Sequence, residues 1–403
     1  MILKFNQMSA STTPRSAIQQ LLQKHKLTDF AQIKKFLSQA PYNFTIREEG
    51  TLYCLSYDLI RSDFSLPAVQ EARGLILRKG TNAIVAKGFT KFFNAKETHS
   101  HLRKLNPKTV RYLDKLDGSL IKLYWDDEQT RFRFGTNNSF DTKQCCVHNT
   151  SITFYDLIME TEAQSIDFNA LDPEYTYLFE LIHPNNPVVI NYNGEKKLTF
   201  LGAVHVPTLT ERDEQSREEL GLPKEIGTPK EYHFKSIDEA IASMNNSTDN
   251  IEGCIAIDDQ FNRVKIKTLK YVNLCHLQKA KPNKTDLLQI VTRGEVSEIL
   301  AYYPELETDL RACHQAFTLV LDKLWVDFCR LQKEIKEEMG YKCGQDLTQK
   351  EVLQIVKTYA YSDLMSTAWS ASQKSKSFEK SNFQEVLSSW KSLKAVCDKH
   401  QKK

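Results

Sequence analysis

The sequence predicts an α+β fold, in which a domain of mostly antiparallel sheets with flanking helices is followed by an all-helical C-terminal domain. Two observations lead to this prediction. From about residue 43 to residue 280, short segments rich in β-branched and aromatic residues are separated by Gly, Asn and Asp turns. Beyond residue 280, apolar residues recur every three or four positions, as they do on amphipathic helices. With 41% hydrophobic and 26% charged residues among 403, the composition is that of an ordinary globular protein.

The chain begins with a segment of helical character. Between residues 14 and 40, apolar residues return at helical spacing, and Pro14 stands where a helix commonly starts. We therefore expect residues 1–42 to form a helical segment that packs on the domain that follows.

The middle of the chain is predicted to form β-strands. The segments that carry this signal include FTIREEGTLYCLSYD, GLILRKG, VRYLDKLDGSLIKLYW, YTYLFELI, KLTFLGAVHV, GCIAIDD and RVKIKTLKYV. Helical pieces intervene around residues 153–163 and 235–244, but without the regular strand–helix alternation of a doubly wound fold. The strands of residues 43–280 are therefore expected to pair mostly antiparallel.

The last part of the chain, residues 281–403, is expected to be a separate all-helical domain. One long amphipathic helix that ends near Gly340 is indicated by apolar residues three and four positions apart, namely Leu310, Cys313, Phe317, Val320, Leu321, Leu324, Phe328, Leu331 and Ile335. Two further segments, 348–372 and 380–399, also have helical character.

Charge and cysteine content exclude several classes of protein. A formal charge of +3 is too small to mark a nucleic-acid binder, so any anionic partner must be held by a local patch. The nine cysteines are scattered without a CxxC or zinc-like spacing, which favours reduced thiols in a cytoplasmic protein. No signal peptide and no apolar run long enough to span a bilayer is present, so we expect no membrane association, and we expect a monomer.

Five charged residues interrupt the predicted strands. Lys115 stands in a K-x-D-G-S turn, Glu180 lies within YLFELI, and Glu252 precedes a glycine in NIEGCIAI. Lys265 and Lys267 alternate in VKIK and share one face of their strand, because residues two apart in a strand point the same way. Each feature taken alone fits the solvated face of an antiparallel sheet. Together they are the groups that covalent nucleotidyl transfer requires.

The chemistry explains why these residue types are needed. A nucleophilic lysine must lose its proton near neutral pH, and neighbouring positive charges would lower its pKa. Lysines that face the phosphates offset the charge that develops on the α-phosphorus and on leaving pyrophosphate. A carboxylate can hold hydrated Mg²⁺, which takes few protein ligands.

The chain contains, in this order, K-x-D-G, the Glu of FELI, EG and K-x-K. These four elements resemble motifs I, III, IV and V of the covalent nucleotidyltransferases, a group that includes DNA ligases, RNA ligases and capping enzymes. Finer matches resemble the bacteriophage-type RNA ligase 1 family, namely ARG (72–74), KFFN (91–94), KLDGSL (115–120), FELIHPNNPVV (179–189), NIEG (250–253) and KIKTLKYV (265–272). This resemblance implies that residues 43–280 form a nucleotidyltransferase (ATP-grasp-like ligase) domain that carries out adenylyl transfer. It also implies that residues 281–403 bias the protein towards particular RNAs, tRNA among them.

The resemblance also implies roles for single residues. Lys115 would become covalently attached to AMP, Asp117 and Gly118 would shape the turn that presents it, and Glu252 would act through a hydrated metal ion. Lys265 and Lys267 would complete the catalytic set by binding the phosphates. Further nucleotide contacts are implied for Tyr57, Arg73, Lys91, Phe93 and Glu180. Tyr271 matches an aromatic residue of the family, although a core tyrosine explains it equally well.

The chain departs from the family at one position. Where the family carries a basic residue after motif I, in a pattern such as T-K-G-S, this chain has Asn137 in TNNSF. An amide can hydrogen-bond a phosphate but cannot neutralise it, so Lys143 could reach in from nearby or the reaction could be slower. For a second metal site, Glu295 and Glu298 are candidates, against the alternative of a solvated helix face.

The first hypothesis is therefore an ATP-dependent RNA ligase that uses ATP and Mg²⁺ or Mn²⁺. Its partner would be RNA with 5′-phosphate and 3′-OH ends, such as nicked tRNA, prepared by a separate kinase or phosphatase because the chain has no G-x-x-x-x-G-K-[ST] loop. A DNA ligase or capping enzyme is a second hypothesis, which the helical C-terminal region disfavours because those proteins continue with a five-stranded OB-fold. A protein that binds nucleotides or RNA ends without turnover is the third.

Overall fold

The computed structural model describes residues 15–147, 150–276, 284–341, 349–373 and 378–390, with residues 393, 396 and 397. By its internal contacts the chain divides into two compact units, an N-terminal unit and a helical unit. The N-terminal unit comprises Met1–Tyr57, Arg61–Ala95 and His99–Tyr271. The helical unit comprises Asp58–Ile60, Lys96–Thr98 and Val272–Lys403. The expected boundary between residues 280 and 281 falls outside the described residues.

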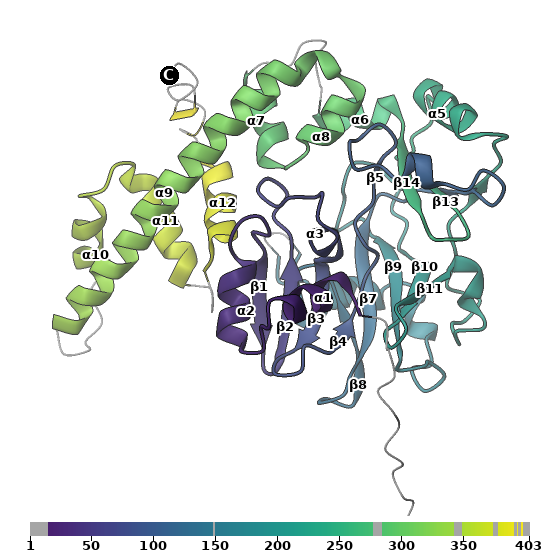
Figure 1. Ribbon diagram of the computed structural model, residues 1–403, viewed down its shortest axis with the longest axis horizontal. Helices are drawn as coiled ribbons and strands as arrows, with labels where there is room; N and C mark the ends of the chain where they lie inside the picture. The colour runs from purple at the N-terminus through teal and green to yellow at the C-terminus, as the bar shows by residue number, and fades with distance from the viewer. Residues whose placement is uncertain are drawn as a thin grey trace, which may run out of the picture. The chain divides into compact units, whose positions relative to one another are not determined.

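The first sheet of the N-terminal unit carries the N-terminal helices (Figure 1). Its strands pair antiparallel in the order β1-β2-β3-β4. Their bounds are Thr45–Glu49, Leu52–Ser56, Arg73–Arg78 and Ile84–Ala86. Helices α1 (Ala17–Lys24) and α2 (Phe30–Leu37) bury their apolar faces, including Ile18 and Ile33, in one core with these strands.

The second sheet supplies the strand that follows the K-x-D-G turn. It has the order β11-β10-β9-β7-β8, and all of its pairs are antiparallel. In chain order the bounds are β7 (Ser119–Asp126), β8 (Arg131–Gly135), β9 (Tyr175–Ile182), β10 (Lys197–His205) and β11 (Thr210–Asp213). Helix α4 (Phe154–Met159) packs on this sheet through Leu157 and Ile158.

The third sheet contains both the strand that ends directly before Lys115 and the strand that carries Lys265 and Lys267. Its order is β12-β6-β13-β14-β5, with one parallel pair, β14 with β5. The bounds are β5 (Phe93–Asn94), β6 (Arg111–Asp114), β12 (Glu231–Tyr232), β13 (Gly253–Ile257) and β14 (Arg263–Lys267). Helix α5 (Ile237–Asn246) covers it through Ala240 and Met244. Short helical segments complete the unit, namely α3 (Pro67–Glu71) and the 3₁₀ turns Leu102–Lys104, Thr142–Gln144, Glu162–Ser165 and Glu214–Arg217.

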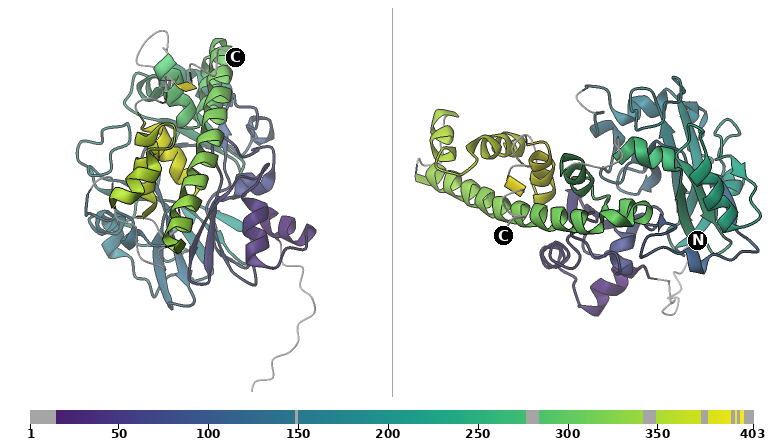
Figure 2. Two further views of the ribbon diagram at one scale, coloured as in Figure 1. Left: turned by 90° about the vertical axis from the view of Figure 1, so that its left-hand side faces the viewer. Right: turned by 90° about the horizontal axis from the view of Figure 1, so that it is seen from above.

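Every regular element that the structure describes beyond Lys267 is helical. After α6 (Leu269–His276), which crosses from one unit to the other, the helical unit contains α7 (Lys284–Thr292), α8 (Val296–Tyr302), a 3₁₀ turn (Pro304–Leu306), α9 (Glu307–Tyr341), α10 (Gln349–Val356), α11 (Ser362–Gln373) and α12 (Lys380–Ser388). The long α9 runs beside α10, α11 and α12 (Figure 2). The nine apolar residues predicted to form one face of this helix are all buried in the core of the unit.

The predicted fold class is confirmed, because antiparallel sheets with flanking helices precede an all-helical region. A five-stranded OB-fold after the K-x-K strand finds no counterpart among the described residues there. Within the described residues, no helix is both long enough and apolar enough to cross a membrane.

Candidate functional site

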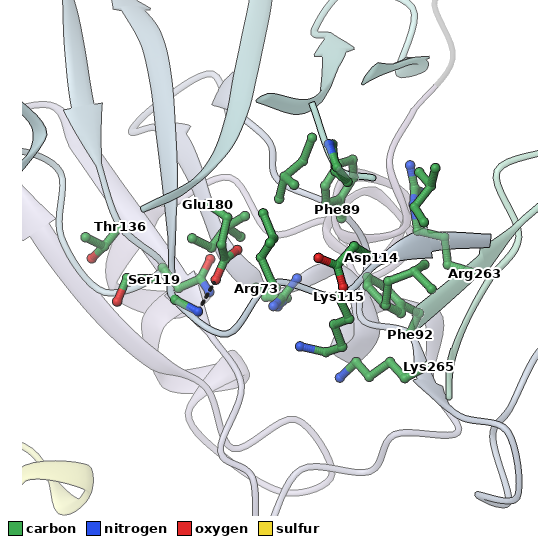
Figure 3. A pocket seen from close by; sticks show the side chains of 18 of the residues that line it. Arg73, Phe89, Phe92, Asp114, Lys115, Ser119, Thr136, Glu180, Arg263 and Lys265 are labelled. Atoms are coloured by element: carbon green, nitrogen blue, oxygen red, sulfur yellow. Dashed lines mark hydrogen bonds between the residues drawn. The ribbon is translucent and has the colours of Figure 1, made fainter. Parts of the chain in front are cut away.

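A cavity of about 540 Å³ lies in the N-terminal unit. Its lining includes Arg73, Lys115, Gly118, Glu180 and Lys265 from the predicted site. Arg73 begins β3, Glu180 lies in β9 and Lys265 lies in β14, so all three sheets contribute. The Lys115 and Lys265 side chains extend toward one another, with the Arg73 guanidinium group beside them (Figure 3). The fold thus gathers residues that are up to 192 positions apart in the chain, from 73 to 265.

The centre of the site is an ion-paired triad. Glu252 Oε2 accepts a hydrogen bond from Lys115 Nζ at 2.6 Å, and Lys267 Nζ lies 3.3 Å from Oε1 of the same carboxylate. Glu252 is buried, whereas Lys115 remains one-fifth exposed. Because burying an unpaired carboxylate is costly, the two ammonium groups account for its stability in this position. The contact also anchors the Lys115 side chain over the cavity.

Sheet register explains how these three residues meet. Strand β13 lies between β6 and β14, and Gly253 stands opposite Lys267. The Lys115 N–H donates to the Gly253 carbonyl at 3.0 Å, which ties the end of β6 to the start of β13. Gly253 has φ +151°, and a Cβ there would lie 2.1 Å from the carbonyl oxygen of Ile266. Glycine after Glu252 is therefore required for this close packing.

Hydrogen bonds of Asp117 hold the K-x-D-G turn in place. Its Oδ2 accepts from the backbone N–H groups of Val189 and Ile190, both at 2.7 Å, and its Oδ1 accepts from the Tyr271 hydroxyl at 2.7 Å. Its own N–H donates to the Tyr192 hydroxyl at 2.8 Å. These bonds fit the predicted role in shaping the turn, and Asp117 does not line the cavity.

Position 118 requires glycine because the backbone of β9 lies close to it. A Cβ at this position would lie 2.3 Å from the carbonyl oxygen of Leu181 on β9. The Gly118 N–H donates to Glu180 Oε1 at 3.0 Å, a bond that a displaced backbone would lose. Burial raises the pKa of Glu180 to about 7, against the opposing influence of the Lys115 charge.

Lys265 lies in the most cationic part of the cavity. Burial, together with the positive charges of Lys91, Lys115, Arg73 and Lys267, lowers the pKa of Lys265 well below its usual range. Its Nζ lies 5.2 Å from the centroid of the Phe92 ring. Cations that are crowded in this way favour the arrival of a polyanion such as a triphosphate.

Lys91 is enclosed by three aromatic rings. Its Nζ lies 5.2 Å from the Tyr57 ring centroid, 4.8 Å from Phe64 and 5.2 Å from Phe93. The three predicted residues Tyr57, Lys91 and Phe93 therefore form one cluster, held together by cation–π attraction. This aromatic cluster lies close enough to the cavity for the Lys91 charge to act on Lys265.

Other predicted residues are placed as follows. Asn137 lines the cavity, and its Oδ1 is buried without a hydrogen-bond partner among the described residues. Lys143 lies over the Tyr155 ring at 4.4 Å and is not part of the cavity lining. Glu295 and Glu298 belong to the helical unit, at the start of α8, and their metal role stays a prediction.

A water-mediated metal contact at Glu252 fits the residues present. Each of its oxygens carries one ammonium contact, which leaves a second lone pair on each for a water ligand of a hydrated ion. Among the described residues, no three His, Cys, Asp or Glu side chains are grouped as a direct protein cage requires. A hydrated cation with few protein ligands is the arrangement that this donor set supports.

Sequence reasoning missed several residues of the site. Asp114 lines the cavity directly before Lys115 and accepts a hydrogen bond from the Tyr232 hydroxyl at 3.1 Å. Lys122, on β7, is fully buried behind the cavity wall. A signal for Lys122 was available, because residues 120 and 124 on the same strand face are Leu and Tyr. A lysine between Leu120 and Tyr124 on one strand face is unusual, because lysine is rarely buried unless it is paired.

Fold and site together define the class of covalent nucleotidyltransferase domains. Residues 71–271 match the model of a family described as RNA ligase, and the chain belongs to this family, that of phage T4 RNA ligase 1. The match covers the interval from just before Arg73 to Tyr271, and thus every predicted site residue except Tyr57, Glu295 and Glu298.

Two curated relatives are similar to the chain. A protein of Autographa californica nuclear polyhedrosis virus, named as a candidate bifunctional polynucleotide kinase/RNA ligase, is 30% identical over 281 residues, which are 65% of this chain and 39% of that protein. An RNA ligase of Rhodothermus phage RM378 is 22% identical over 353 residues, with 73% of this chain and 79% of that protein covered. The chain thus spans about two fifths of the length of the viral relative. Among solved structures, an archaeal ATP-dependent RNA ligase has 13% identity and a TM-score of 0.42, over 68% of this chain and 67% of its own.

Proposed function

We propose that the protein is an ATP-dependent RNA ligase that joins RNA 3′-OH and 5′-phosphate ends through lysyl-AMP and adenylated RNA. The observation that carries the proposal is the Lys115–Glu252–Lys267 triad. Its Lys115 lines a cavity together with Arg73 and Lys265. A nucleophile, a carboxylate and converging cations are the groups that nucleotidyl transfer needs.

In the first step, Lys115 Nζ attacks the α-phosphorus of ATP. A P–N bond forms, the bond to the bridging oxygen breaks, and pyrophosphate leaves. The amine must shed its proton before the attack, and Glu252, at 2.6 Å, is the group placed to receive it. Lys265, Lys267 and Arg73 offset the negative charge that grows on the phosphates.

In the second step, an oxygen of an RNA 5′-phosphate attacks the AMP phosphorus. The P–N bond breaks, Lys115 regains a proton, and a 5′–5′ pyrophosphate linkage forms on the RNA. In the third step, an RNA 3′-OH attacks the RNA 5′-phosphorus, its proton is lost to a base, AMP leaves, and a 3′–5′ phosphodiester remains. Glu180 holds the ribose of the nucleotide throughout, as the family resemblance implies.

A divalent cation, Mg²⁺ or Mn²⁺, would supply charge neutralisation at the phosphates when bound through water to Glu252. The Glu252 carboxylate is held in place by its contacts with Lys115 and Lys267.

The RNA partner follows from the chemistry of the three steps. The substrate must carry a 5′-phosphate, as a nicked tRNA does after end healing by a separate kinase or phosphatase. The viral relative is named for kinase and ligase together, and this chain spans 39% of it. We assign RNA or tRNA selection to the helical unit, because it adds a second folded surface beyond the adenylylation site.

The test is incubation with α-labelled ATP and Mg²⁺, followed by denaturing electrophoresis. Wild-type protein, first stripped of AMP with pyrophosphate, is expected to become labelled, and Lys115→Ala is expected to take up no label because the nucleophile is gone. Label on Lys115→Ala, or none on the wild type, would contradict the proposal. A nucleotide-binding protein without turnover, which Asn137 alone favours, predicts no label on either.

A further inference from the structure

Lys122 is a buried lysine without a counter-ion. Its side chain has 0% exposure, and its ammonium group donates to the carbonyl of Gly74. Within the part of the chain that the structure describes, this carbonyl is its hydrogen-bond partner, and no carboxylate forms an ion pair with it. An ammonium group has three donors, so two are unsatisfied in a place that water does not reach. Such an arrangement costs stability.

Lys87 shows how this fold treats a structural buried lysine. It is about as inaccessible as Lys122, with 7% exposure, but its Nζ lies 3.2 Å from Glu71 Oε1. Its Nζ also donates to the Thr90 hydroxyl at 3.3 Å. The N-terminal unit is therefore able to pair a buried lysine, and the unpaired state of Lys122 calls for another explanation.

The location of Lys122 supplies that explanation. Its Nζ is 2.8 Å from the point that a Cβ of Gly74 would occupy, and Asn137 Cα is 2.6 Å from the same point. Asn137 and Arg73, the neighbour of Gly74 in β3, both line the cavity. The ammonium group of Lys122 therefore stands directly behind the cavity wall at Asn137, where an amide has no charge to offer.

We infer that Lys122 supplies, from behind the wall, the positive charge for the nucleotide phosphates that the Asn137 amide cannot provide. Lys122 is a positioning and electrostatic residue, since it acts across the Gly74–Asn137 wall without touching the ligand. The inference rests on the proposed function. Burial and the Arg73 charge lower the pKa of Lys122. An anion that enters the cavity favours its charged form and is attracted in turn.

The test combines Lys122→Met with a charge restored at the neighbouring position. Methionine keeps the length and apolar stem of lysine but removes the charge. We expect Lys122→Met to slow lysyl-AMP formation at limiting ATP by at least about tenfold, through a raised KM for ATP. Its Tm is expected to equal or exceed that of the wild type, because an unpaired buried charge is gone. The double variant Lys122→Met/Asn137→Lys is expected to recover the rate to within about threefold, since a lysine at 137 places its charge at the same wall.

Lys87→Met is the matched control. It also removes a buried lysine, but it leaves the Glu71 carboxylate with the Ile18 N–H and without its ion-pair partner. Its Tm is therefore expected to fall, while the rate per folded molecule stays at the wild-type value. A wild type that forms lysyl-AMP alongside an equally active Lys122→Met variant would overturn the inference and leave the proposed function standing. A slow Lys122→Met variant that Asn137→Lys fails to rescue, with a lowered Tm, would assign Lys122 a structural role. A wild type without lysyl-AMP would instead overturn the proposed function.

Discussion

At the scale of single residues, the site concentrates cations around two carboxylates. Glu252 is neutralised by two lysines, whereas Glu180 receives one backbone N–H and is enclosed by its surroundings. Burial raises the pKa of Glu180 to about 7. Asp117 illustrates a third role, because its oxygens are bonded to the backbone of a neighbouring loop and to Tyr271. Three carboxylates close in space thus differ in role because their partners differ.

The raised pKa of Glu180 predicts a dependence of stability on pH. Its folded pKa of about 7 lies above the ordinary value of 4.5, so the folded state binds the proton more tightly. The stabilisation is fully present below pH 4.5 and is lost as the pH rises through 7. Each pKa unit corresponds to about 1.4 kcal/mol, so the loss is on the order of 2 kcal/mol after allowance for screening.

The measurement is urea unfolding of the wild type and Glu180→Gln between pH 5 and pH 8. Glutamine keeps an acceptor for the Gly118 N–H but does not ionise. The variant is expected to gain stability relative to the wild type as the pH rises. A difference between the two proteins that does not change with pH would contradict the prediction.

At the scale of elements, the site depends on how β13 fits between β6 and β14. The start of β13 brings Glu252 beside Lys115 and Lys267 because Gly253 allows the strands to approach without a side chain between them. The hydrogen bond from the Lys115 N–H to the Gly253 carbonyl fixes the K-x-D-G turn to the same point.

Gly253→Ala is therefore expected to disrupt the site. A Cβ there would meet backbone atoms at 2.1 and 2.7 Å, and backbone cannot move aside as a flexible side chain can. We expect a loss of about 3 kcal/mol or more in the free energy of unfolding, with lysyl-AMP formation largely abolished. Gly80→Ala is the control, since Gly80 has φ +82° but nothing within 4 Å of a Cβ. It should lose only about 1 kcal/mol, from backbone strain. Equal losses in the two variants would refute the role of close packing.

At the scale of the whole molecule, the two units have separate hydrophobic cores. The largest buried cluster lies in the helical unit and includes Phe317, Phe328 and Phe383, whereas the remaining clusters lie in the N-terminal unit. Every residue that lines the cavity at Lys115 belongs to the N-terminal unit. Adenylylation of Lys115 is therefore expected to depend on the N-terminal unit.

Phe328→Ala tests this separation. Phe328 is fully buried and lies 5.2 Å from Phe383 and 5.4 Å from Phe378 between ring centroids. Its removal is expected to destabilise the helical unit by about 3–5 kcal/mol in calorimetry. Lysyl-AMP formation should stay within about twofold of the wild type, because Phe328 and the cavity lining belong to different units and share no contact partner among the ring contacts of Phe328. Loss of labelling with this variant would show that the cavity needs the helical unit.

The sequence by itself determined the fold class, and it predicted site residues that the fold brings together around Lys115. The strand-like pattern of the sequence changes to helical periodicity after residue 280. Such a local pattern predicts secondary structure because alternation and 3.6-residue spacing reflect which face of a strand or helix is buried. The order K-x-D-G, Glu, EG and K-x-K was sufficient to indicate Lys115, Glu180, Glu252, Lys265 and Lys267. Motifs of this kind are local, so a linear reading detects them.

Only the tertiary structure decided which partners these residues contact. The ion pairs of Glu252, the enclosure of Lys91 by Tyr57, Phe64 and Phe93, and the anchoring of Asp117 all join residues far apart in the chain. Lys122 shows the reason most clearly, because its neighbours come from two other segments, at Gly74 and Asn137. Whether a lysine is solvated or buried depends on the residues that pack around it. The sequence of a single strand does not specify how that strand packs against others.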